Sequence, residues 1–318
     1  MLYVSKNEAQ QVPLDWDVLL DTIEKATEVI AAGQNSEPEH PFVDFPDPAN
    51  RIIALPSYVG GDIDISGIKW IASFPDNINH GLPRANSVTI LNSTENGVPF
   101  AIFNSTLLSI VRTSSVTGTV LRKFFRFRNE KLNVGIIGFG PIGQMHYRML
   151  TEGFSQYINQ VKIFDIREID YPFDGSIPTN FVGTWQEAYE DADVFINATV
   201  TKERYVEGQP KEGALLADIS LRDYKVSIFD HVKDGIIVDD WDQVCRKNTD
   251  IEWFHKEKGL QRDQVYTIAD TIHDKVFGKV DAKNFFFSPF GTAAYDMAIG
   301  KYYYDKVNEL GLGTRLED

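Results

Sequence analysis

The chain has 318 residues, of which 43% are hydrophobic and 24% are charged. This composition is typical of a soluble globular protein with one large or two ordinary domains. Its formal net charge of −15 argues against nucleic acid or an anionic membrane as partner. The single cysteine, Cys245, excludes an intramolecular disulfide. Neither a signal peptide nor a membrane-length apolar run is visible, so a cytoplasmic protein without a membrane partner is expected.

The first half of the chain predicts a β-rich module with helices. A short strand at residues 2–4 precedes an amphipathic helix over residues 13–32. Ser105 is the expected N-cap of a second helix, which runs to about residue 125. Between the helices, alternating and β-branched residues predict strands at 51–55, 65–71, 87–91 and 98–103. We expect this module to be a separate α+β domain for substrate binding and dimerisation, formed by residues 1–128 plus 292–318.

Residues 133–150, NVGIIGFGPIGQMHYRML, carry the pattern around which the chain is organised. An apolar strand, a glycine turn and a helix follow one another, which is the order of a dinucleotide-binding turn. Gly138 permits the tight turn, Gly140 lets a pyrophosphate approach the backbone, and Gly143 lets the helix pack against its strand. The positive N-terminus of the helix then faces the phosphates. The predicted cofactor contacts of the turn are Gly138, Gly140, Pro141, Ile142 and Gly143.

A second predicted strand, residues 160–164, is followed by Asp165. This aspartate lies 22 residues after Gly143, close to the roughly 20 residues at which an acidic side chain binds the ribose hydroxyls. Aspartate repels a 2′-phosphate, so NAD(H) is favoured over NADP(H), although Arg167 lies two residues further on. The alternative is a glycine turn in some other kind of α/β protein.

From residue 133 onward, predicted strands alternate with helices. Buried parallel strands are expected at residues 193–199, 214–219, 235–240 and 284–288, before a closing helix over residues 291–310. This pattern predicts a Rossmann domain over residues 129–291. Ligands of such sheets bind beyond the carboxyl ends of the strands. The polar residues that we predict to contact the cofactor there are Thr199, Thr201, Ser220, Asp240 and Ser288.

Three basic residues lie in segments that otherwise look buried. Arg51 begins an apolar strand, Lys69 lies inside SGIKWIAS, and Arg112 lies inside LLSIVRTSSV. Unpaired burial of a charge is costly, so such residues are normally paired or bind an anion. Each alone is equally compatible with a structural ion pair or a snorkelling side chain. Together they indicate carboxylate recognition, in which arginine binds bidentately and lysine can also exchange a proton.

The segments RIIALPSYVGG, SGIKWIAS, the RTSS helix, NVGIIGFGPIG and VDDW occur in this order and resemble the ornithine cyclodeaminase/mu-crystallin family. The resemblance covers nearly the whole chain. RIIALPS, GGDIDISGIKWI and VDDW are most similar to the branch that makes L-2,3-diaminopropionate for siderophores and antibiotics. The resemblance implies a Rossmann domain joined to a β-rich domain that pairs in a homodimer. It also implies that Arg51, Lys69 and Arg112 hold the substrate carboxylate and assist proton transfer.

The catalytic aspartate of this family lies in the loop after the strand that matches residues 214–219. In cyclodeaminases that loop resembles GGDxPGK, whereas residues 220–225 here read SLRDYK. The glycines and the proline are missing, which argues against ornithine cyclisation. Asp223 is then either an acid/base group or a solvated loop carboxylate.

The resemblance implies NAD-dependent oxidation of N-(2-amino-2-carboxyethyl)-L-glutamate. Hydride leaves the glutamate Cα, and water activated by Lys69 or Asp223 hydrolyses the imine to 2-oxoglutarate and L-2,3-diaminopropionate. The alternatives are an ornithine or lysine cyclodeaminase, a ketimine reductase and a non-enzymatic cofactor-binding protein of the mu-crystallin kind. The six histidines lack metal-ligand spacing, so no metal site is expected. His146 is expected to be a packing or hydrogen-bonded residue.

Overall fold

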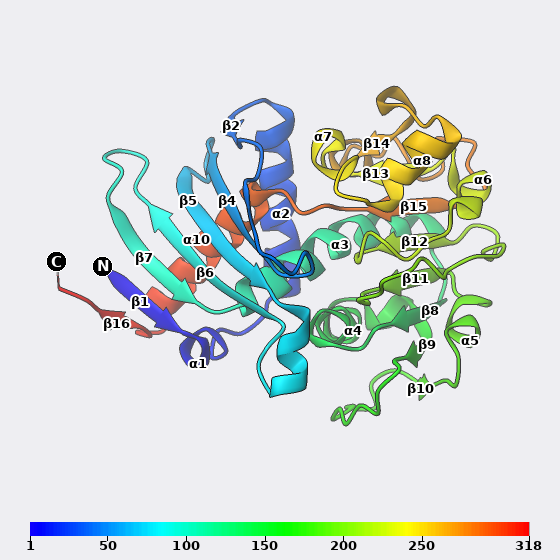
Figure 1. The fold of residues 1–318 in the computed structure, drawn as a ribbon, viewed down its shortest axis with the longest axis horizontal. Coiled ribbons are helices and arrows are strands. Elements are labelled where there is room, and N and C mark those ends of the chain that lie inside the picture. The colour runs from blue at the N-terminus through cyan, green and yellow to red at the C-terminus, as the bar shows by residue number, and fades with distance from the viewer. Residues whose placement is uncertain (318) are drawn as a thin grey trace. The chain divides into compact units, whose positions relative to one another are not determined.

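The computed structural model describes residues 1–317. Its contacts divide the chain into two compact units, drawn together in Figure 1. Unit 1 comprises Met1–Ser115 and the C-terminal segment from Thr292, and unit 2 comprises Val116–Gly291. The first division falls inside helix α3 (Leu107–Arg128), whereas the sequence predicted a boundary at the end of that helix.

Unit 1 is built on a mostly antiparallel sheet of eight strands. Along the sheet the strands are β16 (Thr314–Arg315), β1 (Leu2–Ser5), β7 (Pro99–Asn104), β6 (Ala85–Asn92), β5 (Ile65–Ser73), β4 (Arg51–Val59) and β2 (Asn35–Ser36), with β3 (Phe42–Asp44) also paired to β4. Strands β1 and β7 run parallel, and the other pairs are antiparallel. The predicted strands are all present, and β4 and β5 are longer than expected because they pair along their full length.

Helices pack on one face of the unit 1 sheet. Helix α10 (Ala293–Glu309, red in Figure 1) lies against β4, β5 and β6, and α2 (Trp16–Ala31) packs against α10 and β4. The side chain of Asp15 caps α2 by accepting the N–H of Val18. The short helix α1 (Lys6–Ala9) and the 3₁₀ turn η1 (Pro75–His80) complete the unit.

Unit 2 contains a second sheet of eight strands, all of them parallel. In order they are β10 (Thr179–Phe181), β9 (Ile158–Phe164), β8 (Leu132–Ile137), β11 (Val194–Asn197), β12 (Leu215–Asp218), β15 (Phe285–Ser288), β13 (Ile236–Val238) and β14 (Tyr266–Thr267). The chain winds from β8 to one side and then resumes at β11 on the other, which makes the β8–β11 junction a topological switch point. The predicted Rossmann sheet with a second β-rich domain is confirmed.

The helices of unit 2 are α4 (Pro141–Phe154), α5 (Trp185–Tyr189), α6 (Phe229–Val232), α7 (Trp241–Val244), α8 (Asp250–Lys258) and α9 (Ile268–Ile272), with 3₁₀ turns η2 (Ser155–Tyr157), η3 (Val226–Ile228) and η4 (Arg262–Gln264). Strands β11 and β12 are buried at every position, as expected for central parallel strands. Phe195, Leu216 and Phe286 belong to a shared apolar core.

His146 on α4 is fully buried and bonds the carbonyl of Ile142 and the hydroxyl of Thr117. Its predicted packing role is confirmed. Burial lowers the pKa of this imidazole to about 4, so it is neutral at physiological pH.

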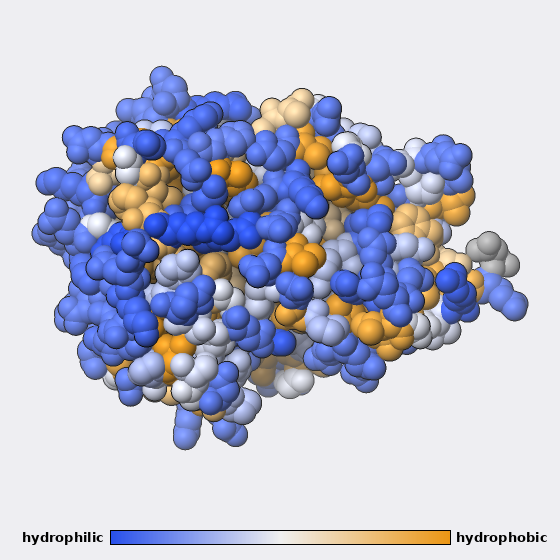
Figure 2. Space-filling view, turned by 180° about the vertical axis from the view of Figure 1, so that it is seen from behind, coloured by the Kyte–Doolittle hydropathy of each residue, from blue (hydrophilic) through white to orange (hydrophobic). Residues whose placement is uncertain are grey.

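The face of the molecule in Figure 2 is mainly hydrophilic, with hydrophobic side chains in separate patches. Among residues 1–317, no helix is long and apolar enough to cross a membrane.

Candidate functional site

The glycine turn after β8 is shaped by close backbone approaches. Gly138 has a φ of 80°, and a Cβ built on it would lie 2.6 Å from the carbonyl oxygen of Ala198. A Cβ on Gly143 would lie 2.1 Å from the carbonyl oxygen of Gly138. Both positions therefore require glycine for the packing of the protein itself.

Gly140 differs from its two neighbours because nothing rigid surrounds it. A Cβ there would meet, within 4 Å, only a terminal nitrogen of the flexible Arg167 side chain, at 3.7 Å. Gly140 is the N-cap of α4, provides no side-chain cap, and is followed by Pro141 at the first helical position. The free N–H groups and positive end of α4 thus border open space, which suits a pyrophosphate.

This contrast makes a prediction for two variants. Gly140→Val is expected to weaken NADH binding at least about 10-fold with little change in melting temperature, because the new side chain enters the space left for phosphate. Gly143→Val is expected to lower the melting temperature, because its Cβ collides with backbone. Fluorescence titration with NADH and thermal unfolding measure the two effects. Unchanged NADH affinity in Gly140→Val would remove this turn as the phosphate site.

Asp165, the predicted ribose ligand, also braces the turn. Its carboxylate accepts the N–H of Phe139 at 2.7 Å and forms a bidentate pair with the Arg167 guanidinium, both bonds at 3.0 Å. Burial acts to raise the pKa of Asp165, but the hydrogen bonds from Arg167 and Phe139 outweigh it, so the pKa is lowered. The group is therefore an ionised acceptor at neutral pH.

Sequence reasoning missed two apolar side chains beside these residues. Ile166, which follows Asp165, is 91% exposed, and Val200, which follows Thr199, is 58% exposed. Both lie just beyond strands that flank β8, where ligands of such sheets bind. Exposed apolar groups there are candidates for contact with an adenine ring. The sequence signal for Ile166 was an apolar residue directly after Asp165, the acid that follows β9.

Asp223 is fully buried and accepts four side-chain hydrogen bonds. The donors are Thr199 at 2.6 Å, Asn197 and Thr201 at 2.8 Å each, and the hydroxyl of Ser220. The structure thus gathers three predicted cofactor contacts around one carboxylate, and the solvated-loop alternative for Asp223 is wrong. Three donors bond Oδ2 and one bonds Oδ1, so Oδ1 keeps an acceptor position.

The remaining predicted residues lie at the same carboxyl edge of the sheet. Ser288 donates to Asp218 at 2.8 Å. Burial raises the pKa of Asp218 well above its usual value, and the nearby carboxylates of Asp250 and Asp223 add to this rise. Asp240 caps α7 by accepting the N–H of Gln243. Direct contact of these groups with a cofactor stays a prediction.

In unit 1, two of the three predicted cations share one carboxylate. Asp296 of α10 lies 2.6 Å from the Lys69 Nζ and 2.9 Å from the Arg112 Nε, and all three side chains are buried. Two basic side chains thus share one carboxylate, and the charge of Glu37 also acts on Lys69. Burial lowers the pKa of Lys69 to about 8, although the Asp296 charge acts the other way. Sequence reasoning missed Asp296, although a lone carboxylate inside the apolar segment GTAAYDMAIG was a usable signal.

A second missed acid holds the start of α10. Glu37 accepts the N–H groups of Ala293 and Ala294 at 2.8 and 3.0 Å, and its carboxylate pairs with the buried His40 at 2.8 Å. The bonds from Glu37 fix the first turn of the helix that carries Asp296. Glu37 is thus a support for the cation cluster.

Arg51 stands apart from the Lys69–Asp296–Arg112 cluster. It is partly buried, and within residues 1–317 no acidic side chain pairs with it. Burial lowers the pKa of Arg51, and the neighbouring positive charge of Arg84 lowers it further. A guanidinium in this setting attracts an anion.

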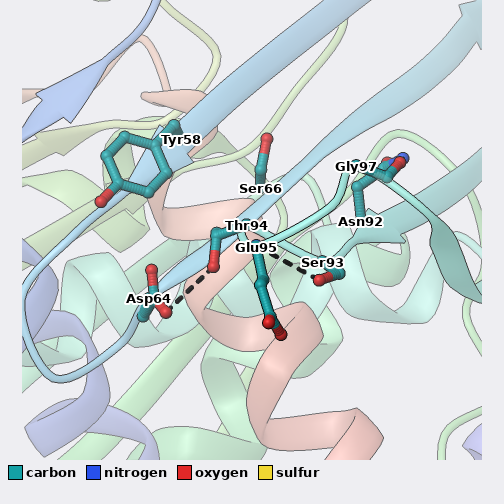
Figure 3. A pocket seen from close by; sticks show the side chains of 8 residues that line it. All are labelled: Tyr58, Asp64, Ser66, Asn92, Ser93, Thr94, Glu95 and Gly97. Carbon is teal, nitrogen blue, oxygen red and sulfur yellow. Dashed lines mark hydrogen bonds between the residues drawn. The ribbon is translucent and has the colours of Figure 1, made fainter.

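A hollow of about 590 Å³ occurs elsewhere in unit 1, between the β6–β7 hairpin and the ends of β4 and β5. Figure 3 shows Thr94 bonded to Asp64 on one side of it and Glu95 beside them. The charged side chains of this hollow are the carboxylates of Asp64 and Glu95. Like charges repel, so the hollow does not suit an acidic substrate.

A parallel sheet with a glycine turn at its switch point and a buried cation cluster define a two-unit α/β protein of the dinucleotide-binding class. The chain belongs to the ornithine cyclodeaminase/mu-crystallin family, whose profile matches residues 4–311. This confirms the family predicted from the sequence.

Two relatives match almost end to end. N-((2S)-2-amino-2-carboxyethyl)-L-glutamate dehydrogenase of Staphylococcus aureus is 29% identical over 334 residues, covering 99% of this chain and 98% of the relative. Alanine dehydrogenase of Archaeoglobus fulgidus is 26% identical over 330 residues, with coverages of 99% and 98%.

Solved structures share the fold. Δ1-pyrroline-2-carboxylate reductase of Thermococcus litoralis, in complex with NADH and L-proline, has a TM-score of 0.87 at 22% identity and covers 99% of this chain and 100% of its own. An archaeal alanine dehydrogenase dimer with bound NAD has a TM-score of 0.83 at 22% identity, with coverages of 100% and 99%.

Proposed function

We propose that the protein is an NAD-dependent dehydrogenase that oxidises the secondary amine of N-(2-amino-2-carboxyethyl)-L-glutamate. The observation that carries the proposal is the buried cluster in which Lys69 and Arg112 share the single carboxylate of Asp296, in a chain that also holds a dinucleotide-binding turn. The cluster suits an amino acid with a carboxylate beside the reacting carbon. The S. aureus relative, with matching activity and 29% identity, supports the choice of substrate.

Arg112 is the proposed carboxylate ligand. Its Nε is engaged by Asp296, and among residues 1–317 its two terminal nitrogens have no other partner. These nitrogens form the fork that binds a carboxylate bidentately. Asp296 therefore orients the guanidinium without blocking it. Arg51, which lacks an acidic partner, is the proposed ligand of a second carboxylate.

Unit 2 supplies the proposed cofactor site, and each unit supplies one candidate acid/base group. NAD⁺ bound at the glycine turn supplies the acceptor for the hydride from the glutamate Cα. Neutral Lys69 accepts a proton from the water that attacks the resulting substrate imine, because a pKa of about 8 leaves part of the amine neutral near pH 7. The Oδ1 of Asp223 is the second candidate acceptor. The water oxygen ends on 2-oxoglutarate, the nitrogen stays on L-2,3-diaminopropionate, and one proton is released with NADH.

The test is an assay of purified protein with this substrate and NAD⁺, followed by absorbance and mass spectrometry. We expect NADH, 2-oxoglutarate and L-2,3-diaminopropionate in equal amounts. NADH without diaminopropionate contradicts the proposed substrate. In a parallel assay with ornithine or lysine, ammonia and a cyclic amino acid without net NADH would identify a cyclodeaminase. NADH binding without turnover of any N-substituted glutamate would identify a binding protein.

We also propose a homodimer formed through the face of the unit 1 sheet opposite α10. Gly67 and Lys69 of β5 face α10, since a Cβ on Gly67 would lie 2.9 Å from the Met297 sulfur and Lys69 bonds Asp296. Alternate residues of a strand point to opposite faces, so Ile68 and Trp70 face away. In register with them, the neighbouring strands present Ala54, Pro56, Val88 and Ile90. This apolar face and the dimer of the related alanine dehydrogenase support the proposal.

Charge on this face is therefore expected to separate the subunits. Trp70, which is 43% exposed in one chain, is the expected anchor. Trp70→Asp is expected to cost at least about 2 kcal/mol of association free energy, roughly a 30-fold weaker dimer. Light scattering coupled to size exclusion measures the mass. Val18→Asp on α2, at a similarly exposed apolar residue, is the matched control and should stay dimeric. A monomeric wild type would refute the proposal.

A further inference from the structure

We propose that Asp250 and Arg204 are a positioning pair that fixes the Asp223 carboxylate for the reaction. Neither residue carries a signal in the sequence pattern, and both lie in unit 2. The inference rests on the proposed function, because it assigns Asp223 a place in that chemistry. Residues 220–225 lack the glycines and the proline of the matching cyclodeaminase loop. The pair explains how this loop still holds the Asp223 carboxylate in one position.

Asp250 bonds the backbone of the Asp223 segment directly. Its Oδ2 accepts the N–H of Asp223 at 3.0 Å and that of Tyr224 at 2.9 Å. Its own N–H donates to the carbonyl of Leu221 at 2.8 Å. Asp250, at the start of α8, therefore holds residues 221–224 by three hydrogen bonds. It accepts two of them through its carboxylate and donates one through its backbone N–H.

Arg204 completes the pair. Its Nε lies 2.6 Å from the Oδ1 of Asp250, and its Nη2 donates to the carbonyl of Asn248 at 2.6 Å. The guanidinium also lies over the ring of Trp253, 4.6 Å from the centroid. Asp250 is fully buried, so without Arg204 its charge would be uncompensated. The ion pair thus keeps an acceptor in place for the two N–H groups.

The loop itself needs such support. Leu221 adopts a φ of 69°, a left-handed conformation that costs a non-glycine residue about 1–2 kcal/mol. It is held there by its N–H to Asp218 at 2.9 Å and by its carbonyl to Asp250. A strained residue persists only where its surroundings over-determine it. Here the Asp218 carboxylate and the backbone N–H of Asp250, both outside the loop, hold Leu221 where a glycine would need no such support.

The backbone bonds also decide where the Asp223 side chain points. Its carboxylate meets four donors, Asn197, Thr199, Thr201 and Ser220, on neighbouring segments. Those donors select a direction only if the Asp223 backbone is fixed, and Asp250 fixes it. A displacement of about 1 Å of a reacting group can cost about 100-fold in rate. Loss of Asp250 is therefore expected to act on turnover.

The test compares Asp250→Asn and Arg204→Met with Asp193→Asn. Asp193 is a matched control, because it is also a buried carboxylate that accepts a backbone N–H, from Asn133 at 2.9 Å, and pairs with Arg128. It precedes β11, at the amino end of the strand, and does not bond the Asp223 segment. Hydrogen–deuterium exchange of residues 219–226, kcat, KM and NADH affinity are measured in each variant.

In Asp250→Asn we expect faster exchange at residues 219–226 and a kcat lowered about 10- to 100-fold. KM and NADH affinity should change less than kcat, because the glycine turn and Arg112 are unaltered and only Ser220 of the predicted cofactor contacts lies in the loosened segment. Arg204→Met should change the same quantities in the same direction. Asp193→Asn should leave kcat and the exchange of this segment at wild-type values, even if its melting temperature falls equally.

Two outcomes would overturn the inference. One is unchanged exchange and kcat in a folded Asp250→Asn protein. The other is an equal loss of kcat, KM and NADH affinity that tracks melting temperature in all three variants, which would show a purely structural role. If wild type does not oxidise N-(2-amino-2-carboxyethyl)-L-glutamate, the proposed function fails by itself. In that case kcat and KM are measured with the amino acid that the wild type does oxidise. The hydrogen–deuterium exchange measurement needs no substrate and still tests the inference.

Discussion

Replacing Lys69 with methionine is expected to lower kcat/KM by about 1000-fold, within the range found for loss of a general base. Methionine keeps the volume and apolar stem of the side chain but cannot exchange a proton. The buried amine of Lys69 lies against Asp296 and Arg112, and burial lowers its pKa to about 8. For wild type, kcat/KM should rise with pH and level off above about pH 8, because the neutral amine is the base.

The variants of Lys69 separate charge from proton transfer. Lys69→Arg keeps a cation that does not titrate in this range, so its residual activity should lack the rise toward pH 8. Lys301→Met, on the exposed side of α10, is the control and should follow wild type. A Lys69→Met enzyme with a wild-type pH profile would move the base to another residue, first to Asp223.

The same pKa affects stability in a defined direction. The unfolded lysine titrates near 10.5 and the folded one near 8, so between these values the unfolded state binds more protons. The free energy of unfolding contributed by this group therefore rises with pH across that window and is lost as pH falls through about 8. The contribution should be missing in Lys69→Met.

Local sequence patterns were sufficient for most of the fold. The strand–turn–helix over residues 133–150 and the alternation in unit 2 are visible because glycine spacing and apolar runs are local features. Strands β2 and β3 were missed because they have two and three residues and form by pairing with β4. Helix α1 was missed because it has only four residues. The division inside α3 was also missed, because its helical pattern continues across Ser115 without a break.

The sequence revealed the charged residues of the site that lie in apolar segments, but not the side chains that pair with them. Lys69 and Arg112 are visible as charges in apolar segments, but Asp296 lies 184 residues beyond Arg112 in the chain. Sequence position likewise suggests that Thr199 and Ser220 lie at strand ends, but it does not reveal that their hydroxyls bond Asp223. Which polar groups satisfy one another inside a protein is set by tertiary packing.

Removing the charge of Asp296 should have the largest effect on stability. Asp296→Asn leaves Lys69 and Arg112 as buried, uncompensated neighbours, and breaking a buried pair in this way costs about 3–5 kcal/mol. Chemical denaturation near pH 7 measures the free energy of unfolding. Asp305→Asn, at an exposed pair on the same helix, is the control and should cost less than about 1 kcal/mol.

The double variant Asp296→Asn/Lys69→Met tests whether the two groups act on each other. Lys69→Met removes one of the two charges that the single Asp296→Asn variant leaves unpaired, so the double variant should lose less stability than the sum of the two single losses. The Asp296 charge also acts to raise the pKa of Lys69, so Asp296→Asn should move the rise of kcat/KM to lower pH. Additive losses together with an unmoved pH profile would mean that Asp296 neither stabilises Lys69 nor sets its proton affinity. The base would then have to be sought among the carboxylates of unit 2.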